Sequence, residues 1–146
     1  MQAFMPSNII RIIDANINRL KEGLRVCEEI TRFILDSRAL TQEFKKIRHK
    51  VNSIANPAFS CLRLLSERKS RADVGKNIYA DELKRNNYRD IFFANIQRAK
   101  ESVRVLEEFS KLKNTAIAIE FKKIRYALYE LEKKVVGKIR TLRNPR

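Results

Sequence analysis

"ANINRLKEGLRVCEE" at residues 15–29 returns as "ANIQRAKESVRVLEE" at residues 94–108. A second phrase, "EFKKIRHKV" at 43–51, returns as "EFKKIRYAL" at 120–128. The first phrase repeats after 79 residues and the second after 77, in the same order. Two ordered phrases at nearly one offset indicate an internal duplication of a unit made of two helices.

The apolar residues around the first phrase follow a helical period. They recur at spacings of three, four or seven and so form one stripe on a helix: Ile10, Ile13, Ile17, Leu20, Leu24, Cys27 and Ile34. Glycine and proline, which interrupt helices, each occur only three times in 146 residues. The sequence therefore predicts an all-α fold, an internally duplicated antiparallel helical bundle of two long-helix hairpins.

We expect residues 1–146 to form a single helical domain, with repeat 1 at about 8–56, a connector at 57–88 and repeat 2 at about 89–142. The first long helix should start at an N-cap on Ser7 and stop at Asp36–Ser37. The second should cover 39–55, before Pro57, and the last 115–142. A short helix ending near Glu67 and a loop, "RKSRADVGKN" at 68–77, are expected within the connector.

The chain is strongly basic, with 32 Lys and Arg against 17 Asp and Glu and a formal charge of +15. Such a charge attracts nucleic acid, acidic lipid or phosphorylated small molecules. Nucleic acid is the less favoured partner, because the chain has no Trp and no clustered aromatics for base stacking. No segment approaches the ~20 apolar residues of a membrane span, and no leader pattern is recognisable. We expect a cytoplasmic protein with reduced, structural thiols at Cys27 and Cys61.

The repeated polar residues admit two interpretations. One strip on the first helix holds Asp14, Asn18, Glu22, Arg25 and Glu29, and the second copy has Phe93, Gln97, Glu101, Arg104 and Glu108 at the same positions. Such a strip is either a solvated face with Glu–Arg pairs or a binding site, which the first copy's greater polarity would favour. Asn16 and Asn95 lie on another side, and we expect them to hydrogen-bond between helices.

Two further positions carry alternatives. His49, beside Arg48, is either a general acid or phosphate ligand or a partly buried structural residue. Asp73, two residues before Gly75, either positions a carboxylate for a metal-bound phosphate or makes a turn. The chain has no GxxxxGK[ST] or GxGxxG motif, so phosphates would be held by Arg and Lys side chains and helix N-termini.

Four phrases together resemble a known family: "IIDANINRLKEGLRVCEEITRFIL", "EFKKIRH", "LLSERKSRADVG" and "ANIQRAKESVRVLEEFSK". They are similar to a bacterial hydroxymethylpyrimidine-phosphate kinase domain, unrelated to the ribokinase type, that occurs in front of thiamine phosphate synthase or alone. The resemblance implies thiamine biosynthesis and phosphoryl transfer from ATP to 4-amino-5-hydroxymethyl-2-methylpyrimidine phosphate, giving the diphosphate that the synthase consumes. Lys69 departs from the family, which tends to have an acidic residue there.

The resemblance and the residue chemistry lead to a predicted site. The predicted catalytic residues are Arg25, Arg104 and Asp73. The predicted substrate-binding residues are Asp14, Asn18, Glu22, Arg48, His49 and Arg68. ATP and Mg²⁺ are the expected cofactors, with Asp73 and Glu22 on the metal. A strong general base is not required, because the attacking phosphate oxygen is already anionic.

The alternative function is a non-catalytic basic helical module that binds RNA or a protein partner such as thiamine phosphate synthase. Salt dependence separates the two, because non-specific nucleic-acid binding weakens steeply with salt. A homodimer is a candidate assembly for either function.

Overall fold

The computed structural model describes residues 4–77 and 83–143, and these residues contain helices and no strand. The elements are α1 (Ser7–Glu29), a π-helical turn (Ile30–Ile34), α2 (Arg38–Ala58), α3 (Cys61–Glu67), a 3₁₀ turn (Ser70–Ala72), α4 (Tyr88–Ser110) and α5 (Thr115–Arg143). The predicted all-α class is confirmed. The origin of the two hairpins by duplication stays a prediction, and part of the predicted connector, residues 78–82, lies outside the described residues.

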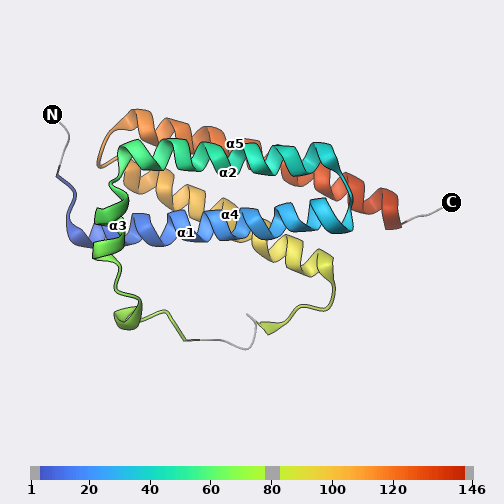
Figure 1. The fold of residues 1–146 in the computed structure, drawn as a ribbon, viewed down its shortest axis with the longest axis horizontal. Coiled ribbons are helices and arrows are strands. Elements are labelled where there is room, and N and C mark those ends of the chain that lie inside the picture. Colours follow the sequence, from blue (N-terminus) through green and yellow to red (C-terminus); the bar gives the residue numbers. More distant parts are fainter. Residues whose placement is uncertain (1–3, 78–82, 144–146) are drawn as a thin grey trace.

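Four long helices form the body of the molecule, and neighbouring helices run antiparallel (Figure 1). Helix α1 packs against α2 and α4, and α5 packs against the same two helices from the other side. The core between them is apolar, and its largest fully buried rings are Phe44, Phe92 and Phe121. Burial of this interior supplies the main driving force for folding.

The predicted apolar stripe is correct up to Cys27 and wrong at Ile34. Ile34 is 48% exposed, whereas the next residue, Leu35, is buried. The π turn causes this shift, because the amide of Leu35 donates to the carbonyl of Ile30, five residues earlier, at 3.0 Å. A π turn adds one residue to a helical period and moves every following side chain around the axis.

Several local predictions need correction. The N-cap of α1 is Pro6 and not Ser7, and α2 continues through Pro57 to Ala58.

The two cysteines are free but differ in burial. Cys27 is buried, and burial raises the pKa of its thiol to about 12, with a further contribution from the charge of Glu132. Cys61 is exposed, so the prediction of a structural thiol is wrong for this residue.

The two repeated asparagines do not join helices. The side-chain amide of Asn16 donates to the carbonyl of Ile12, and that of Asn95 to the carbonyl of Ile91, each at 2.8 Å and each within its own helix. In both cases the side-chain amide finds its acceptor four residues earlier on the same helix, which is a common arrangement for short polar side chains. The expected interhelical role is therefore wrong.

The repeated Glu and Arg residues make the same cluster of ion pairs around a buried glutamate in both hairpins. Glu28 accepts from Arg48 of α2 at 3.2 Å and pairs with Arg25, one turn earlier on α1, at 3.5 Å. The other hairpin has the corresponding partners, because Glu107 accepts from Arg125 of α5 and pairs with Arg104 of α4: the distances are 2.7 Å and 3.1 Å. Much of the repeated polar pattern thus connects the two helices of each hairpin.

The surroundings of Glu107 favour its ionised form. Burial alone would raise the pKa of this carboxyl, but the hydrogen bonds from Arg125 and Arg104 outweigh burial and lower the pKa. Removing one cation from such a buried pair would leave an uncompensated buried charge and would destabilise the fold.

No helix of the described residues is long and apolar enough to cross a membrane.

Candidate functional site

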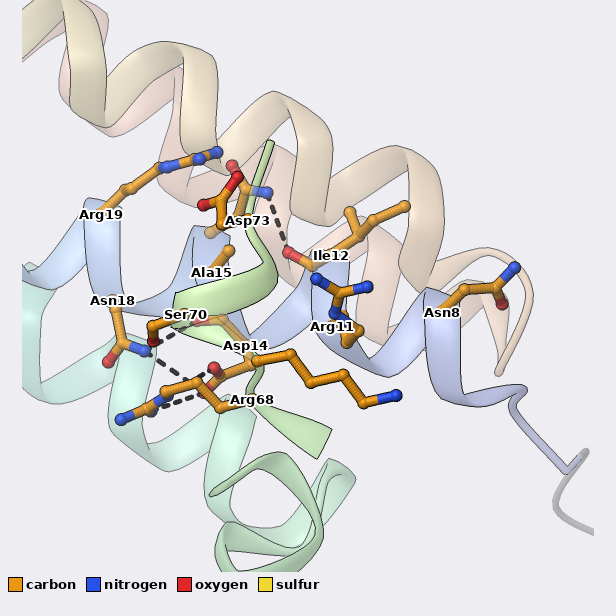
Figure 2. A pocket seen from close by; sticks show the side chains of 12 residues that line it. Asn8, Arg11, Ile12, Asp14, Ala15, Asn18, Arg19, Arg68, Ser70 and Asp73 are labelled. Carbon is orange, nitrogen blue, oxygen red and sulfur yellow. Dashed lines mark hydrogen bonds and ion pairs between the residues drawn. The ribbon is translucent and has the colours of Figure 1, made fainter. Parts of the chain in front are cut away.

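A short exposed segment after α3, residues 68–77, passes the first half of α1, and we call it the strap. Between α1 and the strap lies a hollow of about 480 Å³. Figure 2 shows its side chains, with the strap crossing α1. The lining residues are Asn8, Arg11, Ile12, Asp14, Ala15, Asn16, Asn18, Arg19, Arg68, Lys69, Ser70 and Asp73.

Helix α3 sets the position of the strap. Arg63 of α3 donates to the carbonyl of Met5 at 2.7 Å, and the hydroxyl of Ser7 donates to the carboxylate of Glu67. Ser7 and Asp14 are seven residues apart, which puts them on nearly the same side of α1. The residue that follows Glu67 is therefore delivered opposite Asp14.

That residue is Arg68, and it binds Asp14 through two parallel hydrogen bonds. Its Nε and Nη2 donate to the two carboxylate oxygens, each at 2.8 Å. The side-chain amide of Asn18 also donates to Asp14, at 3.2 Å. Hydrogen bonding to Asp14 raises the pKa of Arg68, and the negative charge of Glu22 adds to this effect. Bidentate arginine–carboxylate pairs are strong and well oriented.

The two partners differ in exposure, which gives them different tasks. The side chain of Asp14 is only 7% exposed, whereas that of Arg68 is 41% exposed. Arg68 has five N–H donors and uses two of them on Asp14, so it retains donors for a ligand in the hollow. Asp14 thus holds a cation at the edge of the hollow in a fixed orientation.

The other end of the strap contributes Asp73. One of its carboxylate oxygens, Oδ1, accepts from the amide of Gly75 at 2.8 Å, so the predicted turn is present. The other oxygen accepts no hydrogen bond from the described part of the chain. Asp73 lines the hollow together with Arg19 of α1 (Figure 2). The turn and the site are compatible, because the turn leaves one carboxylate oxygen available.

Three further cations line the hollow without an acidic partner. Arg11, Arg19 and Lys69 form no ion pair with any residue that the structure describes. With Arg68 they make four cationic side chains around two acidic ones, Asp14 and Asp73. The side-chain amide of Asn18 already donates to the carbonyl and the carboxylate of Asp14, at 3.0 Å and 3.2 Å, so its oxygen remains to accept from the amino group of a heterocycle. This combination suits a small molecule that carries both a ring and a phosphate.

The structure brings together four of the predicted site residues and leaves five elsewhere. Asp14, Asn18, Arg68 and Asp73 line the α1–strap hollow. The remaining residues do not line it. Arg25 and Arg48 line a different hollow. Arg104 pairs with Glu107 and Glu108 on α4. Glu22 is exposed on α1, and His49 is exposed on α2. The catalytic and binding roles predicted for these five residues stay predictions.

The sequence prediction of the site does not include Asn8, Arg11, Arg19, Lys69 and Ser70, which line the hollow. A helical signal was present, because Asn8, Arg11 and Ala15 recur at spacings of three and four. Lys69, the departure from the resembled family, adds a positive charge to the hollow.

The hollow fits a magnesium ion only if the substrate supplies most of the ligands. Among the described residues there is no group of three His, Cys, Asp or Glu side chains that could hold a metal. Mg²⁺ in phosphoryl-transfer sites commonly has one or two carboxylates, and phosphates and waters complete its shell. The free oxygen of Asp73 meets that requirement.

Comparison with known proteins gives a family match and several relatives. The ThiD2 family model matches residues 11–134. A thiamine-phosphate synthase of Synechocystis sp. is 39% identical over 138 residues, covering 94% of this chain and 39% of the relative. Synthases of the same name from Nostoc punctiforme and Rhodopirellula baltica are each 36% identical, covering 88% of this chain and 36% of the relative. The chain thus spans less than two-fifths of these relatives, and no solved structure matches it.

Proposed function

The chain belongs to the ThiD2 family, and from this membership together with the α1–strap hollow we propose that it is a kinase of thiamine biosynthesis. Its substrate is 4-amino-5-hydroxymethyl-2-methylpyrimidine phosphate, its phosphoryl donor is ATP, and its product is the pyrimidine diphosphate. The relatives are named thiamine-phosphate synthase, and the diphosphate is the compound that such a synthase would consume.

One observation carries the proposal: a buried carboxylate fixes Arg68 at a hollow that also holds amide side chains and cations without an ion pair among the described residues. In our proposal Arg68, Arg11 and Arg19 neutralise the phosphates, and the side-chain oxygen of Asn18 accepts from the amino group of the pyrimidine. Asp14 holds Arg68 and Asn18 in place for these contacts. Phosphoryl transfer suits such a site, because its catalysis consists mostly of positioning and charge stabilisation.

The transfer step needs no proton abstraction. An anionic oxygen of the pyrimidine monophosphate attacks the γ-phosphorus of ATP, a new P–O bond forms, and the bond to the β–γ bridging oxygen breaks as ADP leaves. The arginines stabilise the charge that spreads over the transferred group. Mg²⁺, when bound, neutralises phosphate charge, and Asp73 is the residue of this chain that would hold it.

Turnover by the purified chain tests the proposal directly. We would incubate it with ATP, Mg²⁺ and the pyrimidine monophosphate and follow the mixture by ³¹P NMR. The expected result is a new pair of coupled diphosphate signals that matches the pyrimidine diphosphate, formed together with ADP. A preparation without ATP is the control. No diphosphate from folded protein would overturn the proposal.

The non-catalytic alternative makes a different prediction. A basic module for RNA should bind a short RNA strongly in low salt and lose that affinity steeply as salt rises, whether or not the pyrimidine phosphate is present. A module for thiamine phosphate synthase should bind that enzyme without forming diphosphate. Either result without turnover would favour the alternative.

A further inference from the structure

A second hollow, of about 500 Å³, lies at the tip of the hairpin between α1 and α2, and we call it the hairpin hollow. It shares no lining residue with the α1–strap hollow. Its charged residues are five cations and two acids. The cations are Arg25, Arg32, Arg38, Lys45 and Arg48.

The five cations fall into two groups. Arg25 and Arg48 pair with Glu28, the buried acid of the hollow. Arg32, Arg38 and Lys45 are exposed and form no ion pair with any described residue, although Asp36 lines the same hollow. Five cations against two acids leave an excess of three positive charges at one depression, and the exposed cations come from the π turn and α2. Ordinary surface lysines and arginines are more often dispersed among acids.

The backbone adds donors to these side chains. Helix α2 begins at Arg38 after the N-cap Ser37, whose hydroxyl accepts from the amide of Leu40 at 3.3 Å. The amides of Arg38 and Ala39 have no acceptor among the described residues, and the positive end of the 21-residue helix lies at the hollow. Asp36 has a φ of 50°, in the left-handed region, and directly precedes the N-cap Ser37.

The π turn at Ile30–Ile34 is a structural difference between this hairpin and the hairpin of α4 and α5. It carries Arg32, and the described end of α4 has no π segment. At the positions of Arg38 and Lys45 the second hairpin has Thr115 and Lys122, and at the position of Arg32 it has Lys111, which pairs with Glu108. π turns in helices are frequently found at functional sites.

We propose that the hairpin hollow binds an oligophosphate, a chain of two or more phosphate groups, either free or as the tail of a nucleotide. The excess of three positive charges decides the ligand class. A single phosphate group carries about −1.5 to −2 at neutral pH and leaves part of that excess unpaired. A linear oligophosphate carries enough charge and length to reach cations on both helices and the free amides of α2.

This inference does not depend on the kinase activity. The two hollows are lined by different residues. Oligophosphate can therefore bind at the hairpin hollow in a protein without turnover, and turnover can occur in a protein that binds no oligophosphate there. The measurement is therefore made without the pyrimidine substrate and without Mg²⁺.

The probe is inorganic tripolyphosphate, measured by isothermal titration calorimetry. The test variants are Arg38→Gln and Lys45→Gln, because both side chains are exposed and form no ion pair with any described residue. The matched control is Lys122→Gln, because Lys122 occupies the same position of the repeated "EFKKIR" phrase on α5 and is also exposed. Melting temperatures verify that all variants fold.

Each test variant should weaken tripolyphosphate at least about tenfold, as expected for the loss of one charge-assisted hydrogen bond, and the control should change it less than about twofold. Amide signals of Arg38 and Ala39 should shift on titration in a ¹H–¹⁵N spectrum. If ATP displaces tripolyphosphate, the ligand is the tail of a nucleotide. If ATP does not displace it, the ligand is a free oligophosphate. Equal weakening by Lys45→Gln and Lys122→Gln, or unshifted Arg38 and Ala39 amides, would overturn the inference.

Discussion

Gly23 of α1 faces the main-chain carbonyl of Asn95 in α4, and a Cβ added to Gly23 would lie 2.9 Å from that oxygen. The two long helices therefore approach each other closely only because residue 23 has no side chain. Alanine is the better helix former by about 1 kcal/mol. Because the obstacle is backbone, we expect Gly23→Ala to destabilise the protein by about 1–3 kcal/mol despite that preference.

Gly137 of α5 is the matched control, since a Cβ there would meet nothing within 4 Å. Gly137→Ala should stabilise the protein by up to about 1 kcal/mol. Urea denaturation of both variants gives the two values. Equal stabilisation by the two substitutions would show that the helices are not in close contact at Gly23.

A buried hydroxyl on α4 offers a second stability test. Thr31 of the first hairpin donates to the carbonyl of Glu28 at 2.9 Å and lies 3.0 Å from the hydroxyl of Thr41. Ser110 follows Thr31 by 79 residues, Ala118 stands in place of Thr41, and the buried Ser110 hydroxyl has no partner among the described residues. Ser110→Ala should therefore raise the unfolding free energy by about 1 kcal/mol.

Thr31→Val is the comparison for that substitution, because it removes a hydroxyl that has partners and keeps the shape of the side chain. It should lower the unfolding free energy by about 1 kcal/mol. Thermal or chemical denaturation measures both changes. Opposite signs support the assignment, and a loss of stability in Ser110→Ala would show that its hydroxyl is satisfied.

The lowered pKa of Glu107 predicts acid sensitivity. A carboxyl whose pKa is lower in the folded than in the unfolded protein stabilises the fold above its unfolded value, about 4.5, and this stabilisation is lost as the pH falls. Glu107→Gln should cost about 1–3 kcal/mol at pH 7 and reduce the decline of stability between about pH 5 and pH 3. Denaturation curves at a series of pH values measure this. Glu130→Gln, at an exposed position of α5, is the control, and identical pH slopes in wild type and Glu107→Gln would contradict the prediction.

Asp73→Asn separates the turn from the proposed metal contact. Asparagine keeps an oxygen that can accept from the amide of Gly75, but it removes the negative charge. We expect the Mg²⁺ concentration for half-maximal turnover to rise severalfold while the melting temperature stays unchanged. An unchanged magnesium requirement would exclude Asp73 from the metal site.

The apolar period predicted the helices well, because the period of a buried stripe is a local property of the sequence. It failed at Ile34, since an added residue in a π turn leaves no sign in a 3.6-residue period. The contact between Arg68 and Asp14 joins residues 54 apart and depends on how α3 docks on α1. No local pattern contains that geometry.

The site prediction shows the same limit. The polar face of the first helix predicts Asp14 and Asn18, and both line the α1–strap hollow. Arg25 belongs to the same polar strip, but it lies about 16 Å farther along α1 than Asp14 at the ordinary rise per residue. A polar strip on one helix is therefore longer than a single site. Which of its residues share a ligand depends on the segment that packs opposite the helix at each hollow.

The central claim is that the α1–strap hollow is the place of phosphoryl transfer, and two equivalent arginines test it most directly. Arg19 lines the hollow, whereas Arg98, 79 residues later, is exposed on α4, and neither forms an ion pair with a described residue. The measurement is kcat/KM for the pyrimidine phosphate in Arg19→Gln and Arg98→Gln. We predict a loss of at least about tenfold for Arg19→Gln and less than about twofold for Arg98→Gln. Equal values for the two variants would contradict the claim.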